Sequence, residues 1–233
     1  MTNIAASKIR IGILGASGYT GGELLRLLAG HNDMEVSMLS AERRAGLRLA
    51  EVFPCLATMN LPDLVTIDSC DFDSLDAVFC CLPHGTTQQV IAGLPTHLKV
   101  VDLSADFRLV DPKIYAEWYG QEHHAVDLQR EAVYGLTELN RNDIAAARLV
   151  ANPGCYPTGP LLALAPLLEN GQVVGDEIII DAKSGVSGAG REPKLGTLFS
   201  EVDGGAHAYG LAEHRHSPEI DQILSRAAGR TVL

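Results

Sequence analysis

Positive charge is scarce in this sequence. Its 233 residues include 18 lysines and arginines against 29 aspartates and glutamates, which gives a formal net charge of −11. Such an excess of negative charge argues against nucleic acid or an anionic membrane surface as the main partner. It leaves a small anionic substrate possible, because a few well-placed arginines reverse the field locally.

Long apolar runs and cysteine pairs are also missing. No apolar stretch reaches the roughly 18 residues that a membrane-spanning helix needs, and the start MTNIAASKIR has no signal-peptide organisation. The cysteines at 55, 70, 80, 81 and 155 are odd in number and lack metal-site or disulfide-framework spacing. Cys80 and Cys81 lie within DAVFCCLP, a predicted buried strand, so we expect them to pack. These absences predict a cytoplasmic protein without a metal.

Strand-like and helix-like stretches alternate along the chain. The strand-like stretches are 8–14, 34–40, 76–82, 98–104 and 148–154, with helical stretches at 21–31, 85–94 and 160–171 between or after them. This alternation predicts an α/β protein with a parallel sheet. A further strand is expected over 176–185. A final helix is expected over 217–229, with Ser217 as the N-cap and Gly229 as the C-terminal cap.

A glycine-rich loop joins the first predicted strand to the first predicted helix. Gly15, Gly18 and Gly21 lie three residues apart in GILGASGYTGGELL. Glycines at this place permit a tight turn and let a phosphate approach the amides of the helix N-terminus. The spacing differs from strict G-x-G-x-x-G, so a purely structural turn remains the alternative.

The end of the second predicted strand bears on cofactor choice. NAD enzymes usually place an acid there to hold the ribose hydroxyls, whereas this chain reads LSAERRAG. Ser40, Arg43 and Arg44 suit a 2′-phosphate, and Glu42 is the nearby acid. We therefore predict NADP rather than NAD; the alternative is a solvated charge cluster.

Cys155 lies at another strand-to-helix turn, within ANPGCYPTG. A helix N-terminus favours a thiolate, and Asn152, Pro153 and Pro157 would hold the turn rigid. These features suit a nucleophile, with a buried structural cysteine as the alternative.

A histidine cluster precedes the last helix, in EHRHSPE over 213–219. His216 lies just before the helix N-terminus, which opposes protonation, and Glu219 would favour it. Those opposed influences predict an imidazole of near-neutral pKa, suited to general acid–base catalysis. A polar loop or a metal site is the alternative, but no convincing ligand set accompanies it.

Anion-binding groups form a third set. Ser104 and Arg108 end a predicted strand, and the loop KSGVSGAGR supplies Lys183, Ser184 and Arg191. If these converge on Cys155, they would bind a phosphate or carboxylate. Surface arginines without a ligand are the alternative.

Six motifs together closely resemble the N-acetyl-gamma-glutamyl-phosphate reductase family: GASGYTGGELLRLL, LPHG, DLSADFR, NPGCYPTG, KSGVSGAGR and EHRHSPEI. The resemblance runs from about residue 8 to the end. It extends more distantly to the aspartate-semialdehyde and glyceraldehyde-phosphate dehydrogenases. It implies a Rossmann-type NADP-binding domain over 1–153 and an α+β catalytic domain over 154–233, in a homo-oligomer (dimer or tetramer).

The resemblance also implies residue roles. Cys155 would attack an acyl phosphate to form a thioester, with His216 as acid–base and Glu219 orienting it. Cofactor-binding positions would be Gly15, Ser17, Gly18, Tyr19, Thr20, Gly21, Ser40, Arg43, Pro83, Gly85, Ser184 and Gly185. Substrate-binding positions would be Ser104, Arg108, Asn152, Arg191, His214 and Arg215.

Family members normally continue about a hundred residues further, so a truncated, non-catalytic nucleotide-binding module is an alternative. Another is an enzyme similar to aspartate-semialdehyde dehydrogenase that takes a different acyl phosphate. A Cys–His hydrolase is a third, but hydrolysis gives the glycine loop no role.

Overall fold

The computed structural model describes residues 7–173, 178–211 and 213–232. Its centre is a seven-stranded sheet in the order β3-β2-β1-β4-β5-β7-β6, in which every pair of neighbours is parallel. The strands are β1 (Ile9–Leu14), β2 (Met34–Ser40), β3 (Leu64–Val65), β4 (Ala77–Cys80), β5 (Lys99–Asp102), β6 (Val133–Tyr134) and β7 (Leu149–Ala151).

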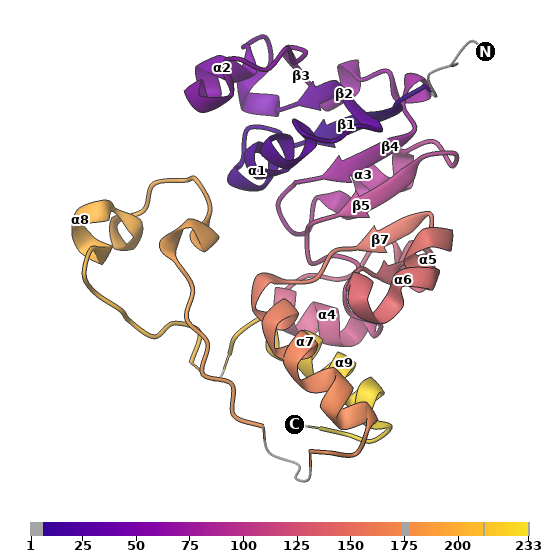
Figure 1. The fold of residues 1–233 in the computed structure, drawn as a ribbon, viewed down its shortest axis with the longest axis vertical. Helices are drawn as coiled ribbons and strands as arrows, with labels where there is room; N and C mark the ends of the chain where they lie inside the picture. The colour runs from indigo at the N-terminus through magenta and orange to yellow at the C-terminus, as the bar shows by residue number, and fades with distance from the viewer. Residues whose placement is uncertain (1–6, 174–177, 212, 233) are drawn as a thin grey trace.

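The α-helices are α1 (Tyr19–Leu28), α2 (Leu49–Val52), α3 (Thr87–Gly93), α4 (Pro112–Tyr119), α5 (Val126–Glu131), α6 (Thr137–Ala146), α7 (Cys155–Glu169), α8 (Phe199–Val202) and α9 (Ser217–Ala228). Short 3-10 turns cover Glu42–Arg44, Pro54–Leu56, Ile67–Ser69, Phe72–Ser74, Val186–Ala189 and Leu195–Thr197. Within the described ranges, every helix is too short or too polar to cross a lipid bilayer. Figure 1 shows α7 and α9 side by side at one end of the sheet.

Both faces of the sheet are buried. Ile11 and Ile13 of β1 pack into one apolar cluster with Leu25 of α1, whereas Leu14 and Val78 belong to a second cluster. Strands covered on both faces are read as near-continuous apolar runs rather than alternating ones. This explains why the strand runs of the first half are recognisable in the sequence, and the predicted α/β parallel sheet is confirmed.

The predicted functional segments follow the carboxyl ends of these strands. Gly15 follows β1, Ser40 ends β2, and LPHG (82–85) follows β4. Ser104 and Asn152 follow β5 and β7. Because parallel strands end at the same edge of a sheet, the loops that bear these residues gather there, where ligands of such sheets bind.

The strand expected over 176–185 is wrong for the residues that the structure describes. Asp176 and Glu177 lie outside the described residues, and 178–185 forms no ladder. A strand needs a partner for its backbone groups, and none of the described segments pairs with this one. The segment 178–211 exposes several large apolar side chains, among them Ile179 at 94% and Phe199 at 78%. Most of it, with α8, stands away from the sheet (Figure 1).

Candidate active site

Cys155 occupies the turn between β7 and α7. It is the first residue of α7, and its side chain is exposed. Gly154 is the N-cap, buried and extended at φ −65° and ψ 156°, without a side-chain cap. The thiol therefore lies at the positive end of a long helix while the backbone directly before it is buried. By contrast, Cys80 is fully buried and burial raises the pKa of Cys81 to about 12, so both pack as expected.

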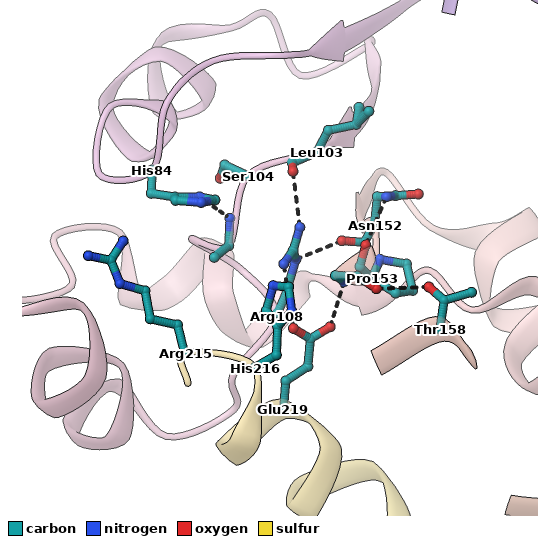
Figure 2. Close-up of polar contacts among 12 residues, drawn as sticks. His84, Leu103, Ser104, Arg108, Asn152, Pro153, Thr158, Arg215, His216 and Glu219 are labelled. Carbon is teal, nitrogen blue, oxygen red and sulfur yellow. Dashed lines mark hydrogen bonds and ion pairs between the residues drawn. The ribbon is translucent and has the colours of Figure 1, made fainter. Parts of the chain in front are cut away.

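A buried ion pair holds the backbone of this turn. Arg108 Nε donates to the carbonyl oxygen of Asn152 at 2.7 Å, and Glu219 Oε1 accepts the N–H of Gly154 at 2.8 Å. Arg108 Nη1 and Glu219 Oε2 lie 3.4 Å apart, with side chains 5% and 1% exposed. Figure 2 shows the two side chains meeting beside Pro153.

His216 lies against the same turn. A Cβ added to Gly154 would come within 2.6 Å of His216 Nε2, so the imidazole packs directly on the residue before Cys155. Burial, followed by the positive charge of Arg108, lowers the pKa of His216 to about 4. The near-neutral pKa expected from the sequence is therefore wrong. The imidazole is therefore neutral at physiological pH, with an unprotonated nitrogen, and it is a weak base while it stays buried in this way.

Glu219 does not orient the imidazole as the resemblance implies. Its hydrogen bonds go to Gly154 and to the hydroxyl of Tyr134, and His216 Nδ1 is buried without a partner. The reason is the geometry of α9. His216 is the N-cap of that helix, while Glu219 projects from its first turn toward Arg108.

Other rings surround His216. His214 lies 4.9 Å away between ring centroids and accepts the backbone N–H of His216 on Nδ1. Tyr156, next to Cys155, makes edge contacts with both imidazoles, and Tyr209 contacts Tyr156 and His214. The sequence reasoning assigned no role to either tyrosine; the position of Tyr156 directly after Cys155 was an available signal.

Ser104 and Arg108 have internal partners rather than open faces. The Ser104 hydroxyl is 1% exposed and donates to Asp102 at 2.7 Å. Arg108 is 6% exposed, and its Nη2 donates to the carbonyl oxygen of Leu103. In this structure both residues therefore hold loops in place, because their polar groups already have protein partners. Ser104 and Arg108 therefore do not form the anion-binding site beside Cys155 that the sequence predicts.

His84 and Arg215 lie on the side of Arg108 that is opposite Pro153 (Figure 2). His84 Nδ1 accepts the N–H of Ala105 at 2.9 Å, which leaves Nε2 as the protonated nitrogen of the neutral ring. The guanidinium of Arg215 lies 5.7 Å over the ring of Tyr119, and His84 meets the edge of that ring. His84 was missed from the sequence, although it lies within LPHG.

The glycine loop has the geometry expected for a dinucleotide. Gly15 has φ +79°, and a Cβ there would lie 2.4 Å from the carbonyl oxygen of Cys81. At Gly21 it would lie 2.7 Å from Ala16. Gly18 caps α1 without a side chain, and Tyr19 and Thr20, exposed, begin the helix. The first amides of α1 thus remain available to a phosphate.

The neighbouring loops complete this region. Ser40 Oγ is fully buried and without a hydrogen-bond partner, and Arg43 is exposed in the next turn. Glu42 accepts the backbone N–H of Ile67 at 2.8 Å. Gly85, after Pro83, has φ +83° and donates its N–H to the buried carboxylate of Asp106.

The loop KSGVSGAGR lies largely in solvent, with Ser184 and Gly185 exposed. Arg191 is its anchor. The guanidinium donates to the carbonyl oxygens of Ser17 and Val52 and lies 4.4 Å over the ring of Phe53. The sequence predicts Arg191 beside the substrate, whereas the structure places it against the glycine loop. Within the described residues, no group of three or more His, Cys, Asp or Glu side chains is arranged to hold a metal ion.

A glycine loop at the end of a parallel strand, with an exposed cysteine at another strand-to-helix turn, defines a dinucleotide-binding protein with a candidate thiol nucleophile. The chain belongs to the semialdehyde dehydrogenase family. Residues 10–147 match the model of the family's NAD-binding domain, and residues 155–233 match that of its dimerisation domain. The first of these matches assigns a nicotinamide dinucleotide to the sheet domain.

Curated relatives are similar over nearly the whole chain. N-acetyl-gamma-glutamyl-phosphate reductase of Afipia carboxidovorans is 59% identical over 98% of this chain and 66% of its own length. The Rhodospirillum rubrum reductase is 56% identical over 97% and 66%, and the probable chloroplastic reductase of Oryza sativa is 58% identical over 96% and 54%. The chain thus spans between about half and two thirds of the length of these relatives.

A solved structure shares the fold. Aspartate semialdehyde dehydrogenase II from Vibrio cholerae superposes with a TM-score of 0.50 at 18% identity, over 70% of this chain and 43% of that chain.

Proposed function

We propose that this chain carries the nucleotide-binding and thiol chemistry of an NADP-dependent reductase. The enzyme converts N-acetyl-gamma-glutamyl phosphate to N-acetylglutamate 5-semialdehyde and phosphate, a step of arginine biosynthesis. The observation that carries this proposal is the 54–59% identity with reductases of that name. The exposed Cys155 with a neutral imidazole packed on its turn supports it independently.

Cys155 is the nucleophile of this proposal. Its Sγ bonds to the acyl carbon, the bond from that carbon to the phosphate oxygen breaks, and phosphate leaves with the electron pair. His216, whose ring is unprotonated and packs on the turn, accepts the thiol proton. A bound reduced nicotinamide supplies the hydride that reduces the thioester. The carbon–sulfur bond then breaks as the aldehyde forms, and Sγ recovers the proton from His216.

The cofactor would lie across the carboxyl edge of the sheet. The first amides of α1, with Ser17, Tyr19 and Thr20, face the phosphates in this arrangement. Pro83 and Gly85 on one side and the loop of Ser184 and Gly185 on the other would enclose the nicotinamide end. The positive φ at Gly15, which permits the tight turn, and the lack of a side chain at Gly18, which lets the backbone approach a phosphate, support this assignment.

NADP is proposed over NAD. Arg43 is exposed in the turn after β2 and is open to a 2′-phosphate, whereas Ser40 is buried beside it. Glu42, the acid that would hold a ribose, is engaged by the backbone of Ile67 instead. Turnover or binding measured with NADPH and NADH tests this choice; a preference for NADH would contradict it.

Substrate binding is assigned to the open side of the Cys155 turn. His214 and Arg215 are partly open to it, while Asn152, Ser104 and Arg108 support its backbone. Arg191 would contribute through the glycine loop that it touches.

Assembly and compartment complete the proposal. The boundary between sheet domain and catalytic domain is placed between residues 153 and 154. The chain would form a dimer or tetramer through the second domain, where 178–211 exposes apolar side chains. A cytoplasmic location would keep the five free thiols reduced.

A second candidate is a nucleotide-binding module without catalysis. The segment 178–185 favours it, because these described residues form no strand and leave Ser184 and Gly185 exposed to solvent. Such a chain would bind NADPH and reduce no acyl phosphate.

The test is the reduction of NADP by N-acetylglutamate semialdehyde in the presence of phosphate. Its rate is measured from the absorbance of the reduced nicotinamide. We expect Cys155→Ser to lower this rate by about 10³-fold or more while NADPH binding stays unchanged. Cys55→Ser is the matched control, since Cys55 is also exposed and free. Equal turnover in the Cys155→Ser variant would contradict the proposal, and NADPH binding without turnover by the wild-type chain would favour the second candidate.

A further inference from the structure

The turn before Cys155 is held on both sides of Pro153. Arg108 donates a hydrogen bond to the carbonyl oxygen of Asn152, and Glu219 accepts one from the N–H of Gly154. These are neighbouring backbone groups on either side of a proline, whose own φ is fixed. The ion pair therefore fixes the direction in which α7 starts, and with it the position of Cys155.

A second hydrogen bond restrains the carboxylate of this ion pair. The hydroxyl of Tyr134 donates to Glu219 Oε1 at 2.7 Å, the same oxygen that accepts the N–H of Gly154. A buried carboxylate is stable only when donors satisfy its oxygens. Burial raises the pKa of Tyr134 far above its usual value, so the hydroxyl keeps its proton and remains a donor.

Tyr134 is also built into the frame of the site. It ends β6, which pairs with β7 so that Tyr134 lies opposite Ala151, the residue before Asn152. Its ring packs in a cluster with Leu161 of α7 and Ile223 of α9. Tyr134 thus connects strand β6 and the helices α7 and α9 to the ion pair. Its hydroxyl lies 85 residues from its acceptor, Glu219, in the sequence.

We propose that Tyr134 is a positioning residue for Cys155: through Glu219 its hydroxyl fixes the Gly154 amide, and so sets the reactivity of the thiol. The inference rests on the proposed role of Cys155 as nucleophile. Without the hydroxyl, Glu219 Oε1 keeps a single backbone donor and gains freedom to move. Less of its negative charge is neutralised beside the start of α7, which disfavours a thiolate there.

The test compares Tyr134→Phe with Ile223→Val, using the rate of alkylation by iodoacetamide at each cysteine. The phenylalanine keeps the ring and removes only the hydroxyl. Ile223→Val trims the same apolar cluster and leaves the hydrogen bonds of Glu219 in place, so it reproduces a loss of stability alone. Cys55, exposed and free, is the internal reference thiol. Exchange of the Gly154 amide with deuterium reports on the turn directly.

We expect Tyr134→Phe to slow alkylation of Cys155 about fivefold across neutral pH, the effect of one hydrogen bond, and to speed exchange at Gly154. Ile223→Val should change neither the alkylation rate of Cys155 relative to Cys55 nor the exchange rate at Gly154. Unchanged alkylation or unchanged exchange in Tyr134→Phe, or equal effects in Ile223→Val, would overturn the role of Tyr134. If Cys155 of the wild-type chain reacts no faster than Cys55, it is the proposed nucleophile that fails.

Discussion

Gly154→Ala is the substitution that tests the geometry of the site most directly. Gly154 has φ −65° and ψ 156°, a conformation that alanine adopts without strain. The added methyl group, however, would lie 2.6 Å from Nε2, 2.8 Å from Cε1 and 2.9 Å from Cδ2 of His216. The substitution therefore acts through the imidazole rather than through the backbone.

The expected size follows from these distances. Ordinary contact begins at 3.4 Å, so the ring must retreat by about 0.8 Å. Forcing a methyl group into a packed site costs roughly 1–3 kcal/mol, and alanine is also a poorer N-cap than glycine. A displacement of about 1 Å at a reacting group lowers a rate about 10²-fold. We expect both losses together.

Urea denaturation measures the first effect, and the rate of NADP reduction measures the second. Gly159→Ala is the matched control. It lies in α7, and apart from its chain neighbours and the helix backbone nothing lies within 4 Å of the added methyl group; the helix gain of alanine is offset by Pro160, which follows it, so the stability should change little. If Gly154→Ala behaves like Gly159→Ala in both measurements, His216 does not pack on the turn and the proposed proton transfer loses its basis.

Two further predictions concern the glycine loop and pH. Gly15→Ala should cost more than about 3 kcal/mol by urea denaturation, because φ +79° and a 2.4 Å approach to Cys81 both oppose it; Gly30→Ala, with open space around it, should not, and equal curves would refute the loop geometry. His216 should titrate by NMR near pH 4, so its contribution to stability is complete above pH 6.5 and is lost as the pH falls toward 4. Asp102 has the opposite effect: burial raises its pKa from 3.8 to about 6, so its contribution to stability is lost as the pH rises through 6. The difference in stability between wild type and His216→Gln therefore isolates the contribution of the imidazole. An imidazole that titrates near 6.5 would contradict the burial of His216.

Local signals in the sequence predicted the parts of the molecule that depend on neighbouring residues. The strand over 34–40 coincides with β2, and the glycine loop between β1 and α1 lies where its spacing indicates. The turn at Cys155 also follows from a strand, a glycine and a helix in succession. Each of these is decided within about ten residues, by apolar runs and by the conformations that glycine permits.

The rest depends on contacts between distant residues. Nothing near Tyr134 indicates that its hydroxyl meets Glu219, and nothing near Glu219 indicates that it binds Gly154 rather than His216. The apolar run of 178–180 predicts a strand, but a strand forms only against a partner, and the described part of the chain pairs none with it. The pKa of His216 likewise depends on burial and on Arg108, which no local pattern reveals.

The place of β7 in the sheet has a consequence for the distance between the glycine loop and Cys155. The N–H of Asn152 donates to the carbonyl oxygen of Asp102, so the residues before Cys155 extend the same ladder that carries the glycine loop. Three strand spacings separate β1 from β7 in the sheet order, about 14 Å at 4.7–4.9 Å each. The sheet therefore sets the distance between the glycine loop and the thiol. Changes within 178–211, which contributes no strand to the described sheet, leave that distance unaltered.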